Sequence, residues 1–240
     1  MLTKRMKEIL AASAGRGWLL EPDGKELLKN AGLLVPRFAF ARSVQEALRF
    51  ARTIGYPLVA KVVSPLVLHK SDHGGVLTGI AADEEVQAAW RRLSTIEGFE
   101  GMLVEETVQG VEMIVGAKID FQFGPVILLG MGGTAVDVCP DAAIRMAPLA
   151  NGDPGRMIQC LRGRRLLEGY RGRTPVDLAS LSDLLLRFSS IVMDLLGVIE
   201  SIDLNPVMCS SRASVIADVR VMLKPRTTNP LSGHAVDSTP

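Results

Sequence analysis

The stretch LVLHKSDHGGV, residues 66–76, most constrains the fold, because it joins two segments that are both typical of β-strands. The apolar run before it predicts a buried strand over 58–63, and residues 76–81 predict a strand that pairs back across the loop. The loop holds reactive, charged and flexible residues that a simple turn does not need: His69, Lys70, Asp72, His73, Gly74 and Gly75. We therefore expect a strand pair with a functional loop between its strands.

Composition excludes several classes of protein. The chain has 240 residues, 48% of them hydrophobic and 22% charged, which is ordinary for a globular protein. A formal net charge of +1 gives no general attraction to nucleic acid or membranes, and two Trp and two Tyr are too few for a base-stacking platform. Cys139, Cys160 and Cys209 lack the spacing of a disulfide framework or a zinc site. Without a signal-peptide pattern or a long apolar run, we expect a cytoplasmic protein.

Helix and strand signals predict an α/β chain with two lobes. A helical extension over 1–20 precedes a small α/β lobe over 21–98 and a larger mixed lobe over 99–223. The tail over 224–240 is rich in Pro, Thr and Ser, so we expect it to be poorly ordered.

The sequence DLNP near the end of the larger lobe suggests a metal site. Asp203 and Asn205 are two residues apart, so in a strand their side chains share one face. Asp218 lies in the next predicted strand, and antiparallel pairing would bring the three together. Three hard oxygen donors suit Mg²⁺. The alternative is a polar pair that faces solvent on an edge strand.

Lys61 and two glycine loops suggest phosphate binding. Lys61 lies inside an apolar strand, where it either guards a sheet edge or points towards a phosphate. Gly74 and Gly75, and the GMGG stretch at 130–133, would let backbone amides approach phosphate oxygens. Each signal is weak alone.

Carboxylates at strand ends complete the pattern. Glu105 and Glu106 end one predicted strand and Glu112 begins the next, where they are either exposed charges or ligands of a ribose or an adenine. Combined with the lysine, the glycine loops and the acid cluster, they indicate an ATP·Mg²⁺ cleft between two lobes.

The same stretches resemble a known family. IGYPLVAKVVSPLVLHKSDHGGV, GMLVEETVQGVEMIVGAKIDFQFGPVILLGMGG, VCPDAAIRMAPL and IESIDLNPV resemble the β subunit of ADP-forming acyl-CoA synthetases (acetate–CoA ligase, ADP-forming). The likeness covers about residues 20–223, and a more distant one links the chain to the succinyl-CoA synthetase β subunit. It implies an ATP-grasp fold, in which two α/β lobes enclose a nucleotide cleft.

The resemblance also implies roles for particular residues. ATP or ADP would be bound by Lys61, Gly74, Gly75, Val76, Glu105 and Glu112. Mg²⁺ would be bound by Asp203, Asn205 and Asp218.

Three catalytic residues are implied in the same way. His69 would carry the phosphoryl group as a phosphohistidine, since an imidazole is a competent nucleophile towards phosphorus. Arg145 would lie near the phosphates, and Asp137 stands one methylene shorter where the family has Glu. His73 has no implied role, and we expect it to make a local hydrogen bond.

The resemblance further implies a partner. A CoA-binding ligase α subunit, in an α2β2 hetero-oligomer, would complete the reaction of acyl-CoA, ADP and phosphate to carboxylate, CoA and ATP. Neither nucleic acid nor a membrane is expected as a partner. Two alternatives stay open: another ATP-grasp carboxylate ligase that works through an acyl phosphate, and a non-catalytic nucleotide-sensing subunit.

Overall fold

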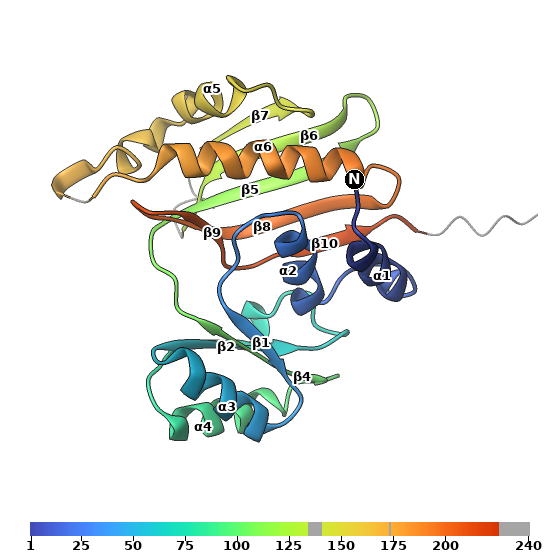
Figure 1. Cartoon of the computed structure of the whole chain (residues 1–240), viewed down its shortest axis with the longest axis vertical. Coiled ribbons are helices and arrows are strands. Elements are labelled where there is room, and N and C mark those ends of the chain that lie inside the picture. Colours follow the sequence, from blue (N-terminus) through green and yellow to red (C-terminus); the bar gives the residue numbers. More distant parts are fainter. Residues whose placement is uncertain (134–140, 173, 226–240) are drawn as a thin grey trace, which may run out of the picture.

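Two antiparallel sheets organise the residues that this computed structural model describes, which are 1–133, 141–172 and 174–225 (Figure 1). The smaller sheet has the strand order β1-β4-β2-β3. Its strands are β1 (Phe38–Ala41), β2 (Leu58–Val63), β3 (Val76–Ile80) and β4 (Gly101–Glu106). Helices α3 (Val44–Ile54) and α4 (Asp83–Leu93) pack against it, and their apolar faces form a core with the strands.

The larger sheet has the order β10-β8-β5-β6-β7, with β9 paired to β8. Its strands are β5 (Val111–Asp120), β6 (Gly124–Met131), β7 (Ala142–Met146), β8 (Ile199–Cys209), β9 (Ser214–Ile216) and β10 (Arg220–Leu223). Helix α6 (Leu178–Asp194) runs across this sheet beside α5 (Asp153–Cys160) (Figure 1). The apolar stripe of α6 faces the larger core, where Leu181, Leu185, Phe188 and Val192 are buried. Short 3-10 segments, Arg162–Leu166 and Tyr170–Gly172, lie between the two helices.

The N-terminal segment joins the two sheets. Helix α1 (Lys4–Ser13) leads to Leu19, whose N–H donates to the carbonyl of Val221 on β10. Helix α2 (Glu21–Asn30) then lies between the sheets (Figure 1). Its Leu27 and Leu28 are buried in the core of the larger sheet. The first turn of α2 is therefore held close to strands of both sheets.

The sheets divide the chain differently from the predicted lobes. Strand β4 falls in the predicted larger lobe, but it is hydrogen-bonded between β1 and β2 of the smaller sheet. Helix α2 falls in the predicted small lobe, but its apolar face packs on the larger sheet. The sheet that an element joins depends on long-range pairing, which local sequence patterns do not contain.

The predicted loop between two strands is confirmed. Strand β2 pairs antiparallel with β3, with Lys61 opposite Val76, and Ser71–His73 form a 3-10 turn. Gly74 has φ +61, which favours glycine. A Cβ on Gly75 would lie 2.6 Å from Cγ1 of Val62 and 2.9 Å from the carbonyl oxygen of Lys70, so the loop closes tightly only with glycine there.

The expectation that Asp218 lies within a strand is wrong. The segment predicted as one strand consists of β9 and β10, which both pair with β8, and Asp218 lies in the break between them. The break frees its side chain from the alternation of a strand.

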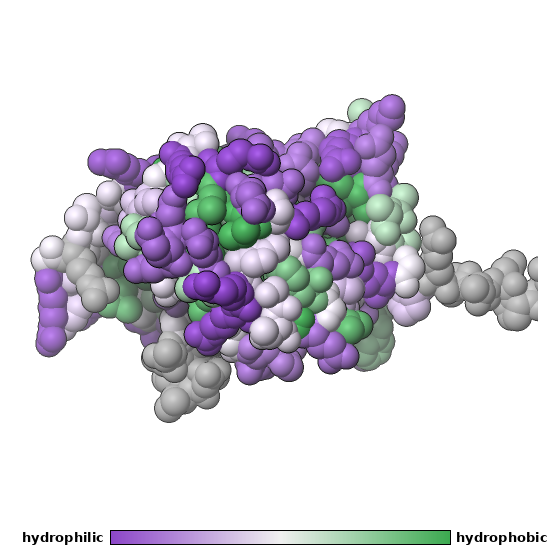
Figure 2. Space-filling model, turned by 90° about the horizontal axis from the view of Figure 1, so that it is seen from below, coloured by the Kyte–Doolittle hydropathy of each residue, from purple (hydrophilic) through white to green (hydrophobic). Residues whose placement is uncertain are grey.

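Figure 2, seen from the α3–α4 end, shows a mainly hydrophilic face with separate hydrophobic patches. In the described ranges, no helix is long and apolar enough to cross a membrane. Most of the predicted tail, from residue 226 onwards, lies outside the described residues.

Candidate functional site

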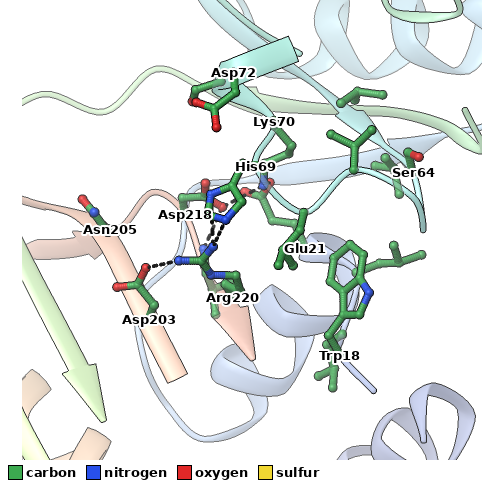
Figure 3. Close-up of a pocket in the computed structure, with 18 residues that line it drawn as sticks. Trp18, Glu21, Ser64, His69, Lys70, Asp72, Asp203, Asn205, Asp218 and Arg220 are labelled. Atoms are coloured by element: carbon green, nitrogen blue, oxygen red, sulfur yellow. Dashed lines mark hydrogen bonds and ion pairs between the residues drawn. The ribbon is translucent and has the colours of Figure 1, made fainter. Parts of the chain in front are cut away.

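A pocket of about 190 Å³ lies between the loop after β2 and the strands β8 and β10 (Figure 3). Trp18, Leu20, Val63 and Val67 contribute an apolar wall. The charged and polar side chains that matter most for its chemistry are His69, Lys70, Asp203, Asn205, Asp218 and Arg220. The predicted phosphoryl carrier and the three predicted metal ligands therefore line one pocket.

Three side chains form a partly exposed chain of contacts, which we call the His69 bridge: His69, Arg220 and Asp203 (Figure 3). Nη1 of Arg220 lies 3.3 Å from Nδ1 and 3.2 Å from Nε2 of His69. Nη2 of Arg220 donates to Oδ2 of Asp203 at 3.0 Å. Arg220 on β10 stands directly opposite Asp203 on β8, so strand pairing itself brings these two side chains together.

A second group of charges lies deeper, and we call it the Glu21 cluster: Glu21, Lys25, Lys61, Lys70, Glu105 and Asp218. Glu21 is the first residue of α2, where the helix dipole favours a carboxylate. Its Oε1 accepts from Nζ of Lys61 at 2.8 Å, and its Oε2 accepts from Nζ of Lys70. Three cations and three anions thus balance one another, which burial requires.

Lys61 is engaged in this cluster, and it is not among the residues that line the pocket. Besides Glu21, its Nζ lies 2.7 Å from Oε1 of Glu105 and donates to the carbonyl of Ala217 at 2.7 Å. Its three N–H groups therefore all have partners. The alternative that Lys61 is an edge-strand gatekeeper is wrong, because β2 lies between β4 and β3 and the side chain is buried. Its predicted contact with phosphate would require these bonds to exchange.

Lys70 is the lysine that faces the pocket. Its Nζ pairs with Glu21 and lies 3.0 Å from Oδ1 of Asp218, so two of its three donors are engaged by the cluster. Although Lys70 follows His69 in the chain, the two side chains point to different parts of the pocket (Figure 3). Lys70 is therefore better placed than Lys61 to meet an anion in the pocket.

The two acids that share Lys70 differ in their pKa. Burial raises the pKa of the Glu21 carboxyl, but the charges of Lys61, Lys70 and Lys25 outweigh burial and hold this pKa well below its usual value. Burial, followed by the negative charge of Glu21, raises the pKa of Asp218, and Lys70 and Lys61 only partly compensate. The positive charge around Asp218 therefore does not offset burial and the charge of Glu21, whereas the three lysines around Glu21 more than offset its burial.

The donor set fits Mg²⁺. Asp203, Asn205 and Asp218 offer hard oxygens to the same pocket, and the raised pKa of Asp218 indicates a carboxylate that another cation would stabilise. Within the described parts of the chain, no three His, Cys, Asp or Glu side chains form a metal-binding group, and binding of Mg²⁺ by Asp203, Asn205 and Asp218 stays a prediction. Of the alternative for Asp203 and Asn205, the edge strand is wrong, because β8 lies between β10 and β5, whereas Asn205 is exposed as that alternative expects.

The predicted phosphate cradle is closed in this structure. The N–H of Gly75 donates to the carbonyl of Lys70 at 2.7 Å, and the N–H of Gly74 donates to the carbonyl of Ser71 at 3.1 Å. Val76 is paired with Lys61 in the sheet. The glycines shape the loop, and their binding of phosphate stays a prediction.

Other predicted residues lie away from this pocket. Both oxygens of Glu105 bind lysines, at 2.7 Å from Lys61 and 2.6 Å from Lys25, so its carboxylate faces the cluster. Glu112 is exposed on β5, where its carbonyl accepts from Gly132 of the GMGG loop at 2.7 Å. Arg145 lies on β7, at the opposite end of the strand order from β10.

The two remaining predictions concern single residues. His73 is exposed in the 3-10 turn and is not among the residues that line the pocket. Asp137 lies outside the described residues, so its predicted role stays a prediction.

Three residues of the site were missed from the sequence. Glu21 and Lys25 are spaced as an ordinary exposed ion pair on a helix, so nothing local marks them as buried. Arg220 looks like a polar position in an alternating strand. A strand alignment that places it opposite Asp203 would have found it.

Two antiparallel sheets with an acid-lined pocket between them define an ATP-grasp domain, and a family model described as ATP-grasp domain matches residues 10–223. The chain is 35% identical over 230 residues to the β subunit of acetate–CoA ligase [ADP-forming] I from Pyrococcus furiosus, which covers 92% of this chain and 99% of that one. The chain belongs to the family of β subunits of ADP-forming acyl-CoA synthetases.

Other relatives are longer. Acetate–CoA ligase [ADP-forming] I from Archaeoglobus fulgidus is 40% identical over 223 residues, which are 90% of this chain but 32% of that protein. The chain thus spans about a third of the length of that relative.

Solved structures match this chain along almost its whole length. Acetyl-coenzyme A synthetase 1 from Ca. Korarchaeum cryptofilum, in complex with coenzyme A and Ca-AMPCP, matches with a TM-score of 0.86 and 36% identity over 92% of this chain and all of that one. Another structure of that protein, with Mg-AMPPCP and a phosphohistidine segment pointing towards the nucleotide binding site, has a TM-score of 0.80 and 36% identity, and covers 91% of this chain and 100% of that one.

Proposed function

We propose that this chain transfers a phosphoryl group between His69 and the terminal phosphate of ATP or ADP, as the nucleotide-binding subunit of an ADP-forming acyl-CoA synthetase. The observation that carries the proposal is the placement of His69 in one pocket with Asp203, Asn205 and Asp218. A phosphoryl carrier is useful only next to the site of the nucleotide it serves.

Five polar residues of the pocket have a chemical task in this scheme. Asp203, Asn205 and Asp218 would hold Mg²⁺, which neutralises the charge of the nucleotide phosphates. Lys70 offers an ammonium to the transferring group. His69 attacks phosphorus with the lone pair of one ring nitrogen, and the bond from phosphorus to the leaving ADP oxygen breaks. The reverse step returns the electron pair to the ring.

The complete reaction needs a partner. In the Ca. Korarchaeum cryptofilum structure a phosphohistidine segment points towards the nucleotide site, which supports delivery of the phosphoryl group to this pocket by another segment. We propose that a CoA-binding α subunit provides it, in an α2β2 assembly, and that the pair converts acyl-CoA, ADP and phosphate to carboxylate, CoA and ATP.

Labelling with [γ-³²P]ATP and MgCl₂ tests the proposal. The wild-type chain is expected to acquire acid-labile label on His69, and His69→Asn to acquire none. His73→Asn is the matched control, because that histidine is exposed in the same loop and does not line the pocket. Equal labelling of His69→Asn and wild type would refute the carrier role and favour an amine ligase that needs no histidine.

A further inference from the structure

The guanidinium of Arg220 lies between the two groups that phosphoryl transfer has to bring together, and the scheme above gives it no task. It contacts the ring of His69 with one nitrogen and the carboxylate of Asp203 with the other (Figure 3). We propose that Arg220 is a positioning residue: it holds His69 in the pocket and releases Asp203 when that carboxylate binds a divalent cation. This inference rests on the proposed function.

The contact with His69 holds the ring without committing either nitrogen. Nη1 of Arg220 is almost equally far from Nδ1 and Nε2, at 3.3 and 3.2 Å, so it is not directed at one lone pair. A guanidinium has donors only, so the ring next to it has to act as the acceptor. The contact therefore keeps the ring beside Arg220 and leaves open which of its nitrogens acts as the nucleophile.

The contact with Asp203 is suited to exchange. The side chains of Arg220 and Asp203 are 32% and 36% exposed, so water competes for both. Ion pairs at this level of exposure are weak. Asp203 can thus leave Arg220 for a cation, in contrast to Glu21, whose partners are buried with it.

If Asp203 left Arg220 to bind a cation, Nη2 of the Arg220 guanidinium would become free beside His69. A guanidinium binds phosphoryl oxygens with two parallel N–H groups, which an ammonium does not. During transfer from His69 to ADP, an ADP oxygen forms the new P–O bond and the N–P electron pair returns to the ring. The ring leaves as neutral imidazole if its other nitrogen carries a proton. Arg220 takes no part in that proton balance and orients the group.

Two substitutions separate the two contacts in the full-length chain. Arg220→Gln removes the charge from Asp203, so Mn²⁺, titrated by electron paramagnetic resonance in the presence of ADP, is expected to bind about two- to fivefold more tightly. The same variant is expected to label from [γ-³²P]ATP roughly tenfold or more slowly, because His69 is no longer oriented. Arg220→Lys keeps a charge near Asp203 but loses the fork, so we expect Mn²⁺ affinity close to that of wild type together with slow labelling.

Arg212→Gln, at an exposed arginine before β9, is the matched control and should change neither measurement. A merely structural role would weaken metal binding and labelling together, which would overturn the inference, as would an Arg220→Gln protein that matches wild type in either measurement. If wild type itself takes no label, the proposed function fails, and the Mn²⁺ titrations still decide whether Arg220 competes for Asp203.

Discussion

The Glu21 cluster and the His69 bridge both pair cationic side chains with carboxylates in neighbouring parts of one site, yet they differ in burial. Side chains of Lys25, Glu21 and Lys61 are 0–6% exposed, whereas those of Arg220 and Asp203 are about one-third exposed. Charges out of water cannot lose a partner without a large cost, whereas exposed charges can turn to water. The comparison teaches that the cluster fixes the two sheets relative to one another, and that the bridge is where groups can exchange.

The largest expected effect comes from removing one anion of the cluster. Glu21→Gln leaves three lysines, two of them buried, with two carboxylates, so the free energy of unfolding is expected to fall by about 3–5 kcal/mol. Chemical denaturation of the full chain measures it. Glu26→Gln, on the same helix and half-buried, is the control. A loss below 1 kcal/mol would mean that the cluster behaves like the bridge.

The folding stability of Glu21→Gln is also expected to depend on pH differently from that of wild type. The folded-state pKa of Glu21 is lowered, so its contribution to stability is complete above the ordinary value of 4.5 and is lost as pH falls through the folded pKa. Glu21→Gln should therefore lose less stability than wild type over that acid range.

Asp218→Asn is expected to stabilise the fold, by less than Glu21→Gln destabilises it. The folded-state pKa of Asp218 is raised, so its ionised form costs stability at neutral pH, and this cost disappears as pH falls through the folded pKa. The amide oxygen can still accept from Lys70 and from the N–H of Val219. At pH 7 the melting temperature should rise, while Mn²⁺ affinity falls.

Asp72→Asn, at an exposed residue of the same pocket, is its control and should leave the melting temperature unchanged. A destabilisation of Asp218→Asn as large as that of Glu21→Gln would show that Asp218 belongs to the structural part of the cluster.

The smallest effect on stability is expected from an ion pair outside both the Glu21 cluster and the His69 bridge. Arg187 and Asp183 form an exposed pair one turn apart on α6, at 2.7 Å. Arg187→Gln should leave the melting temperature unchanged within error, because solvent screens both charges. A clear shift would show that exposure does not separate weak from strong ion pairs in this protein.

Local sequence signals were sufficient to predict many of the helices and strands. Ser43 caps α3 by accepting from the N–H of Glu46, Gly55 ends that helix with φ +83, and Asp177 caps α6, and each is a residue type typical of its position. The reciprocal bond of Glu46 goes to the N–H of Arg42. These features depend on residues within one turn of each other, which is why the sequence reveals them.

The site was predicted less completely. His69, Asp203, Asn205 and Asp218 carry unusual chemistry in recognisable stretches, and they meet in the pocket. The partners of Lys61 could not be predicted, because they come from α2, from β4 and from the break before β10. Their meeting depends on how the two sheets pack, and a lysine in an apolar strand says only that some partner must exist.

One acceptor in the cluster is invisible to side-chain mutagenesis. The carbonyl oxygen of Ala217 receives Lys25 and Lys61, each at 2.7 Å. Since every amino acid offers the same oxygen, alanine scanning at this position would report nothing about its importance. Replacing the following amide linkage with an ester, which weakens that oxygen as an acceptor, would reveal how strongly two ammonium groups depend on a single backbone atom.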